Sequence, residues 1–201
     1  GYAVREQQIE LAEAVSECME SNGRLIAEAG TGTGKTFSYL VPALLSRKRV
    51  IISTGTKTLQ EQLFHRDLPT VRDALNVPVA IAMLKGRANY LCPYRLELEL
   101  QEGWLASKKE VDWLQRIKEW AGRTKTGDLS ELTSIPEEAP IRSKVTSTGE
   151  NCLGGDCPRI EECFLIEARR KAQEADVLVV NHYLLFADMM VKADGFGEVL
   201  P

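Results

Sequence analysis

What this chain of 201 residues lacks excludes several classes of protein. It has no apolar run of the roughly 20 residues that a membrane-spanning helix needs, and no signal-peptide pattern at its start. It also has no excess of positive charge, since 25 lysines and arginines face 29 aspartates and glutamates, so bulk charge does not indicate a nucleic-acid-binding protein. We therefore expect a cytoplasmic protein without membrane contact.

Cysteine is scarce, and its five copies are unevenly spread along the chain. Cys18 shares a predicted helical face with apolar residues, which indicates a buried filler side chain. The other four are Cys92, Cys152, Cys157 and Cys163, of which three fall within twelve residues. In a chain without an export signal, such cysteines are expected as thiols or metal ligands before disulfides.

The clearest motif is a glycine-rich loop between the apolar run Leu25–Ala27 and a helix-compatible segment at 37–45. Strand, glycine loop and helix in this order are typical of a phosphate-binding P-loop. Lys35 is predicted to reach the β- and γ-phosphates of ATP, and the Thr36 hydroxyl to hold Mg²⁺. The alternative is an ordinary glycine-rich turn. The predicted nucleotide-binding loop residues are Ala29, where the strict pattern has glycine, Gly30, Thr31, Gly32, Thr33 and Gly34.

Alternating strand and helix patterns predict a parallel α/β sheet around this loop. Residues 1–22 are expected as a helix, 49–55 as a strand, and 56–64 as the next helix. Further strands are expected at 77–84 and 176–181.

The α/β pattern stops after about residue 87 and resumes near residue 169. We therefore divide the chain into a first sheet segment at 1–87, a mainly helical insertion at 88–168, and a second sheet segment at 169–201. Trp113, Ile117 and Trp120 share one helical face, which favours a small core over a base-stacking platform. Residues 127–147 are polar and are expected as a loop.

The four clustered cysteines are spaced C-x59-C-x4-C-x5-C. Four thiolates that meet at one point can hold Zn²⁺ or an iron–sulfur cluster. Zinc usually prefers tight C-x2-C pairs, so the longer gaps favour a [4Fe–4S] cluster. Zinc and two disulfides remain as alternatives at this stage.

Two other polar elements allow either a binding or a structural interpretation. Gln8 lies about twenty residues before the glycine loop. Its amide could pair with adenine, or the side chain could simply face solvent. Thr54 and Thr56 follow a predicted strand, where they could bind a backbone phosphate or simply cap the next helix.

Five segments of the chain together resemble one known family, the iron–sulfur helicases of superfamily 2, in the DinG/YoaA branch related to XPD. They occur here in the family's order, and the resemblance covers residues 1–201. They are the glycine loop 29–36, the segment 53–63, the Leu-Lys-Gly-Arg-Ala-Asn-Tyr-Leu-Cys run at 84–92, the three-cysteine cluster, and residues 175–185.

This resemblance implies the N-terminal part of an ATP-driven DNA helicase that moves 5′ to 3′ in DNA repair or replication. It implies a RecA-like lobe, and Cys92, Cys152, Cys157 and Cys163 as ligands of a [4Fe–4S] cluster. It also implies adenine recognition by Arg5 and Gln8, DNA contacts by Thr54 and Thr56, single-stranded and forked DNA as substrates, and a clamp-loader accessory subunit of the replicative polymerase as a partner.

The residues beside Cys92 are further candidates for contact with single-stranded DNA, by charge and by stacking: Lys85, Arg87 and Tyr90. We expect the cluster chiefly to stabilise the insertion, with redox sensing as the alternative. His182 is expected to pack at a loop end. Two rival functions are a zinc-stabilised nucleotide-binding switch and a small-molecule P-loop kinase.

The 201 residues contain no Asp-Glu-Ala-His sequence, the box by which relatives hold Mg²⁺ and position the attacking water. A second motor domain with its arginine finger is also absent from these residues. Phosphoryl transfer depends on both groups, so we expect these residues alone to hydrolyse ATP negligibly. Phosphate release with and without single-stranded DNA measures this, and robust DNA-stimulated turnover would contradict it.

Overall fold

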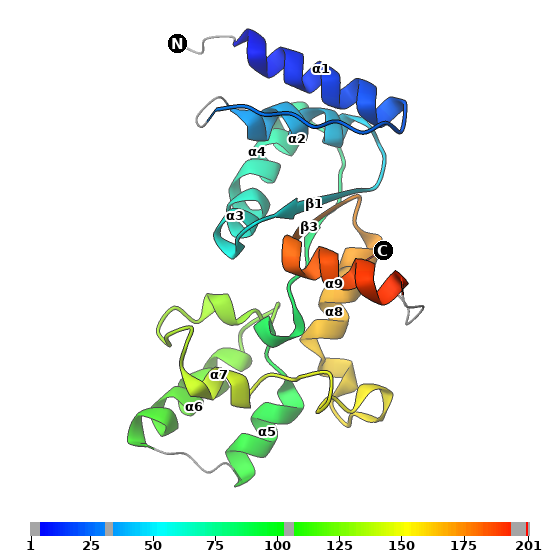
Figure 1. Ribbon diagram of the computed structural model, residues 1–201. Helices are drawn as coiled ribbons and strands as arrows, with labels where there is room; N and C mark the ends of the chain where they lie inside the picture. The colour runs from blue at the N-terminus through cyan, green and yellow to red at the C-terminus, as the bar shows by residue number, and fades with distance from the viewer. Residues whose placement is uncertain (1–4, 31–33, 103–106, 194–199, 201) are drawn as a thin grey trace. The chain divides into compact units, whose positions relative to one another are not determined.

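The computed structural model describes residues 5–30, 34–102, 107–193 and 200, which form a small parallel sheet and mostly helices (Figure 1). The chain divides into two compact units. We call Gly1–Leu84 with Ala172–Pro201 the sheet unit, and Lys85–Lys171 the inserted unit. None of the described helices has the length and apolar character needed to cross a bilayer.

The sheet has three strands, β1 (Val50–Thr54), β2 (Ile81–Met83) and β3 (Val177–Asn181), in the order β1-β3-β2. Both pairings are parallel, with Val177 opposite Val50 on one side and Ile81 on the other. The apolar residues of β3, from position 177 to 180, are at most 2% exposed. Such a continuous apolar run is typical of a strand covered on both faces, and the predicted parallel α/β sheet is confirmed.

The sheet unit contains the three helices expected at 1–22, 37–45 and 56–64, and further helical segments that the sequence analysis did not predict. They are α1 (Glu6–Glu20), α2 (Lys35–Leu45), α3 (Lys57–Gln62), a π-helical segment (Leu63–Asp67), α4 (Leu68–Leu75) and α9 (His182–Ala193). The helix α1 lies along α2 (Figure 1). The core between helices and sheet is made of Leu40, Leu44, Ile52, Leu63, Leu68, Val71, Val177 and Val179.

The predicted strand before the glycine loop is not formed. Residues 23–30 have no regular secondary structure, and Ile26 is 100% exposed. A strand needs a neighbour for its backbone hydrogen bonds, and the described sheet contains only β1, β3 and β2. The strand expected at 77–84 is also shorter, because regular pairing is limited to Ile81–Met83.

The inserted unit has its own hydrophobic core, built around α5 (Pro93–Glu102), α6 (Lys108–Ala121) and α7 (Pro140–Lys144). Ile117 is 0% exposed, and Trp113 and Trp120 pack against the same cluster. This placement confirms that the tryptophan face of the helix belongs to a core. The helix α8 (Phe164–Glu174) begins directly after Cys163, the last clustered cysteine.

Residues 127–147 are more than the polar loop that the sequence indicates. They supply a large part of the inserted core, namely Leu129, Leu132, Ile135, Ala139, Ile141 and Val145. The Arg142 guanidinium donates hydrogen bonds to the carbonyls of Leu129, Leu132, Ile135 and Pro136, and so holds the segment in place. Burial lowers the pKa of Arg142. The sequence does not predict these core residues, because the apolar positions in this segment have neither helical nor strand periodicity.

Candidate functional site

The end of the glycine loop joins directly onto the helix α2, whose first residue is Lys35. Gly34 precedes it with a φ of 82°, a left-handed conformation that glycine adopts without steric cost. The Lys35 ammonium donates a hydrogen bond to the Ala29 carbonyl, which joins the two ends of the loop. Thr31, Gly32 and Thr33 between them lie outside the described residues.

The other loop residues surround the same helix start. Lys35 and Gly30 are exposed, while Thr36 is half-buried and hydrogen-bonded to the Tyr39 hydroxyl. Burial is the main reason why the pKa of Tyr39 is raised. An exposed ammonium beside the N-terminus of an eleven-residue helix suits a phosphate group, because the unpaired N–H groups and the helix dipole both favour negative charge.

The predicted adenine-reading residues lie at the start of α1. Arg5 is exposed and immediately precedes the helix, and Gln8 is half-buried one turn later. A Cβ atom added to Gly34 would lie 1.6 Å from Gln8 Nε2, so the Gln8 amide lies directly against the loop. The structure therefore brings Gln8 to the loop, and any side chain at position 34 would displace it.

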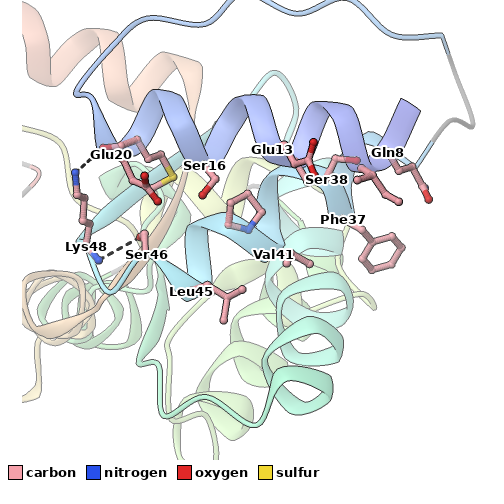
Figure 2. Close-up of a pocket in the computed structure, with 14 residues that line it drawn as sticks. Gln8, Glu13, Ser16, Glu20, Phe37, Ser38, Val41, Leu45, Ser46 and Lys48 are labelled. Atoms are coloured by element: carbon pink, nitrogen blue, oxygen red, sulfur yellow. Dashed lines mark hydrogen bonds between the residues drawn. The ribbon is translucent and has the colours of Figure 1, made fainter. Parts of the chain in front are cut away.

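Two cavities adjoin the Gln8 side chain. The larger, of about 590 Å³, lies between α1 and α2 and has a mainly apolar lining that includes Ile9, Val41 and Pro42 (Figure 2). The smaller, of about 380 Å³, is lined by loop residues such as Lys35. Gln8 and Ser38 line both cavities. No sequence signal pointed to Ser38, which looks like an ordinary helical serine.

Thr54 and Thr56 make the contacts of a helix start. Thr54 is 7% exposed, and its hydroxyl donates to the Thr56 carbonyl at 3.0 Å. The Thr56 hydroxyl accepts the Leu59 N–H at 3.2 Å and so caps α3. Beside them, the Ser53 hydroxyl lies 2.7 Å from His182 Nδ1. His182 is an exposed residue at the start of α9, so the expected packing at a loop end is wrong.

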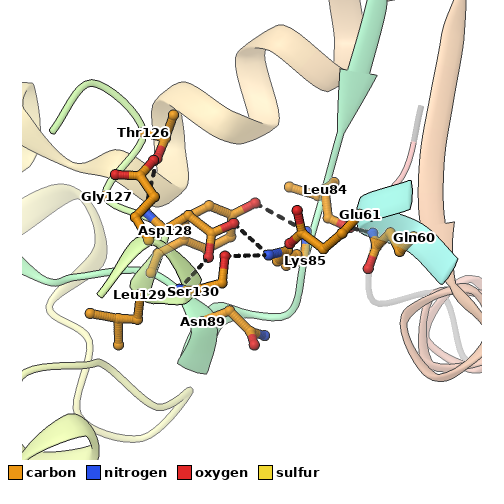
Figure 3. Close-up of polar contacts among 12 residues, drawn as sticks. Gln60, Glu61, Leu84, Lys85, Asn89, Thr126, Gly127, Asp128, Leu129 and Ser130 are labelled. Atoms are coloured by element: carbon orange, nitrogen blue, oxygen red, sulfur yellow. Dashed lines mark hydrogen bonds and ion pairs between the residues drawn. The ribbon is translucent and has the colours of Figure 1, made fainter. Parts of the chain in front are cut away.

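Lys85 and Tyr90 are buried, which contradicts their predicted role as DNA contacts. Figure 3 shows the Lys85 side chain pointing toward Asp128 and Ser130. The Lys85 side chain is 2% exposed, and its ammonium lies 2.5 Å from Asp128 Oδ2 and 3.1 Å from Ser130 Oγ. The Tyr90 hydroxyl accepts the Lys85 backbone N–H at 3.0 Å. Their charge and ring face are therefore turned into the inserted unit. Arg87 is half-buried, and its guanidinium lies 3.4 Å from Ser147 Oγ.

The four clustered cysteines are all free thiols. Burial raises the pKa of the Cys92 thiol, and the neighbouring Cys163 and Cys157 thiols raise it further. The pKa of the exposed Cys152 is lowered, chiefly by a hydrogen bond from the Gly154 N–H and also by the Arg87 side chain. The charges of the Cys157 and Cys163 thiols are therefore near enough to influence the Cys92 thiol.

These thiols do not assemble into a metal-binding group in this structure. Over the described ranges, no three side chains of the ligand types His, Cys, Asp and Glu are placed to hold a metal ion. The donor chemistry is that of a soft metal or an iron–sulfur cluster, but the positions of the sulfur atoms do not fit one.

Replacing Asp128 tests the buried pair. Asp128→Ala removes this carboxylate from the buried Lys85 ammonium, so we expect the free energy of unfolding to fall by about 3–5 kcal/mol. Asp112→Ala is the control, because Asp112 pairs with Arg116 at the surface, where both side chains are at least half exposed. Its cost should stay below about 1 kcal/mol. Urea unfolding measures both, and equal small losses would contradict the assignment.

Comparison with known proteins places these features in a family. The DEAD/DEAH box helicase family matches residues 8–90. Over its whole length the chain is 51% identical to the ATP-dependent DNA helicase YoaA of Haemophilus influenzae and 49% identical to that of Escherichia coli, covering 31% and 32% of those proteins.

A third relative is more distant. The chain is 35% identical, over 96% of its length, to the ATP-dependent helicase DinG of Mycobacterium tuberculosis (strain H37Rv), of which it covers 32%. It therefore spans about a third of the length of these curated relatives. With the glycine loop and the parallel sheet, these similarities show that the chain belongs to the DinG/YoaA family of the DEAD/DEAH box helicases.

Proposed function

We propose that this chain is the ATP-binding part of a DNA helicase that moves 5′ to 3′ along a single strand. The observation that carries the proposal is the position of Lys35, an exposed ammonium at the N-terminus of α2 that joins the two ends of the glycine loop. A triphosphate that enters the loop would replace the Ala29 carbonyl as the partner of this ammonium. The relatives named as ATP-dependent DNA helicases support this function.

The loop residues would hold the phosphates, and α1 would hold the base. Gly30 and Gly34 leave room for backbone N–H groups to face the phosphates, and the Thr36 hydroxyl would exchange Tyr39 for Mg²⁺. When bound, Mg²⁺ would neutralise charge on the phosphates. Gln8 lies beside the loop and Arg5 begins the same helix, so both could reach the adenine edge.

DNA would bind at the end of the sheet that carries Thr54 and Thr56. These residues join β1 to α3, and backbone N–H groups at such a turn suit a phosphate of the strand. Of the three DNA-contact candidates beside Cys92, Arg87 remains, since Lys85 and Tyr90 are buried. We propose single-stranded and forked DNA as substrates, in repair or replication, with a clamp-loader accessory subunit as partner.

We further propose that Cys92, Cys152, Cys157 and Cys163 bind a [4Fe–4S] cluster once their sulfurs are drawn together. The support is that all four are free thiols in one unit, and that backbone N–H groups of Tyr94, Arg95 and Gly154 hydrogen-bond to two of the sulfurs. The cluster would stabilise the inserted unit. The competing proposal is a nucleotide-binding switch stabilised by zinc, because four thiolates can also bind Zn²⁺.

Replacement of Lys35 tests nucleotide use. In the full-length protein, Lys35→Ala should lower ATP hydrolysis at least about 100-fold, because the charge facing the transferred phosphoryl group is lost. Lys118→Ala, at an exposed position of α6, is the control and should hydrolyse ATP normally. Unfolding curves establish that both variants fold. Undiminished hydrolysis by Lys35→Ala would remove the basis of the proposed site.

Metal analysis tests the cysteine proposal. Full-length protein purified without oxygen should be brown and contain iron and acid-labile sulfide, and Cys163→Ser should lose both. Cys18→Ser is the matched control, because Cys18 lies in α1 outside the inserted unit, and it should keep both. A colourless protein with one zinc per chain would favour the switch instead. Full iron content in Cys163→Ser would refute this ligand set.

A further inference from the structure

We propose that Ser38 reads the nucleobase of ATP, as a specificity-determining residue in the cavity between α1 and α2. The inference rests on the proposed function, since it concerns the nucleotide held by the glycine loop. It goes beyond the loop and Gln8, because neither accounts for a polar residue buried one turn further along α2.

The Ser38 hydroxyl is buried and has no hydrogen-bond partner. Ser38 is 3% exposed, and its Oγ contacts no donor or acceptor among the described residues. Other serines of the sheet unit show the ordinary solution, since the Ser21 hydroxyl donates to the Glu17 carbonyl and the Ser46 hydroxyl to the Ala43 carbonyl. An unpaired buried hydroxyl destabilises a fold, so its presence calls for a partner that binds there.

The Ser38 backbone carbonyl also lacks its usual helical partner. In an α-helix this carbonyl would accept the N–H of residue 42, but residue 42 is a proline inside the helix and has no N–H. Pro42 lines the same cavity as Ser38. One residue therefore offers both a hydroxyl that can donate and a carbonyl that can accept, with neither engaged in the normal helix pattern.

This pair of groups matches the edge of adenine. Adenine presents an amino group, which donates, next to a ring nitrogen, which accepts. The carbonyl could accept from the amino group while the hydroxyl donates to the ring nitrogen. Guanine presents an oxygen in place of the amino group, and that oxygen would face the carbonyl without a hydrogen bond. This match of donor and acceptor types would favour ATP over GTP.

The cavity also suits a base in position and lining. It has a volume of about 590 Å³, and its mainly apolar wall includes Ile9, Val41 and the ring of Phe37 (Figure 2). Ligand sites commonly combine such a wall with a few polar groups. Ser38 and Gln8 also line the smaller cavity that contains Lys35, so the base would lie next to the phosphates.

Two variants test the inference in full-length protein, with dissociation constants for ATP, GTP and inorganic tripolyphosphate. Ser38→Ala removes one hydrogen bond to the base, so ATP should bind about two- to twelve-fold more weakly. Pro42→Ala restores an N–H that can occupy the Ser38 carbonyl, so the preference for ATP over GTP should shrink. Tripolyphosphate has no base, so both variants should bind it as the wild type does.

Stability separates this role from a structural one. Ser38→Ala removes an unpaired hydroxyl, and Pro42→Ala removes a proline from a helix, so neither should lower the unfolding midpoint. Ser21→Ala is the matched control, because Ser21 lines neither cavity and has a partner; it should leave ATP binding unchanged.

Three results would overturn the inference: unchanged ATP and GTP binding in both variants, equal loss of ATP and tripolyphosphate, or a lower midpoint with unchanged binding. Failure of the proposed function looks different. In that case the wild type would bind neither ATP nor tripolyphosphate, and Lys35→Ala would change nothing.

Discussion

The position of β3 between β1 and β2 is the constraint on which the sheet unit depends. Residues 177–181 hydrogen-bond to residues 50–54 on one side, and residues 177–179 pair with residues 81–83 on the other. The chain must therefore return to the middle of the sheet after it has built the inserted unit. Buried apolar residues along β3 make this return favourable, because the strand is covered on both faces.

This return also brings polar residues together at the carboxyl ends of the strands. Gln60 is 0% exposed, and its amide donates to the carbonyl of Leu84, just beyond the end of β2, and to the carbonyl of Val179, in the middle of β3. Ser53 and His182 join the ends of β1 and β3 in the same way. Side chains from distant parts of the chain thus hold this end of the sheet together. Ligands of parallel sheets commonly bind at this end.

Buried polar groups serve different ends in the two units. In the inserted unit, the buried Lys85 pairs with Asp128, and the half-buried Arg142 donates to backbone carbonyls, so both residues hold the irregular segment 127–147 in place. In the sheet unit, Ser38 is buried without a partner beside the glycine loop. Satisfied groups of the first kind specify a fold, whereas an unsatisfied group next to a cavity is a place where a ligand can supply the missing bond.

The sequence by itself determined the features that depend on near neighbours. The glycine loop before Lys35 and the strands β1 and β3 form through the local backbone preferences of glycine and of β-branched residues. The place of the loop before α2 and the parallel sheet could therefore be predicted. The order of the motifs along the chain indicated the family. The closure of the four cysteines around one centre remains a prediction.

Only the tertiary structure decided what depends on distant partners. The sequence predicts Lys85 to be an exposed charge, but in the structure it pairs with Asp128, which lies more than 40 positions later in the chain. Leu25–Ala27 has strand-like residues but no strand beside it in the described sheet. The core residues between 127 and 147 follow no period, because the carbonyls around Arg142 position them. The burial of a side chain, its ion pairs and the missing hydrogen-bond partner of the Ser38 hydroxyl depend on tertiary packing, which local sequence patterns do not encode.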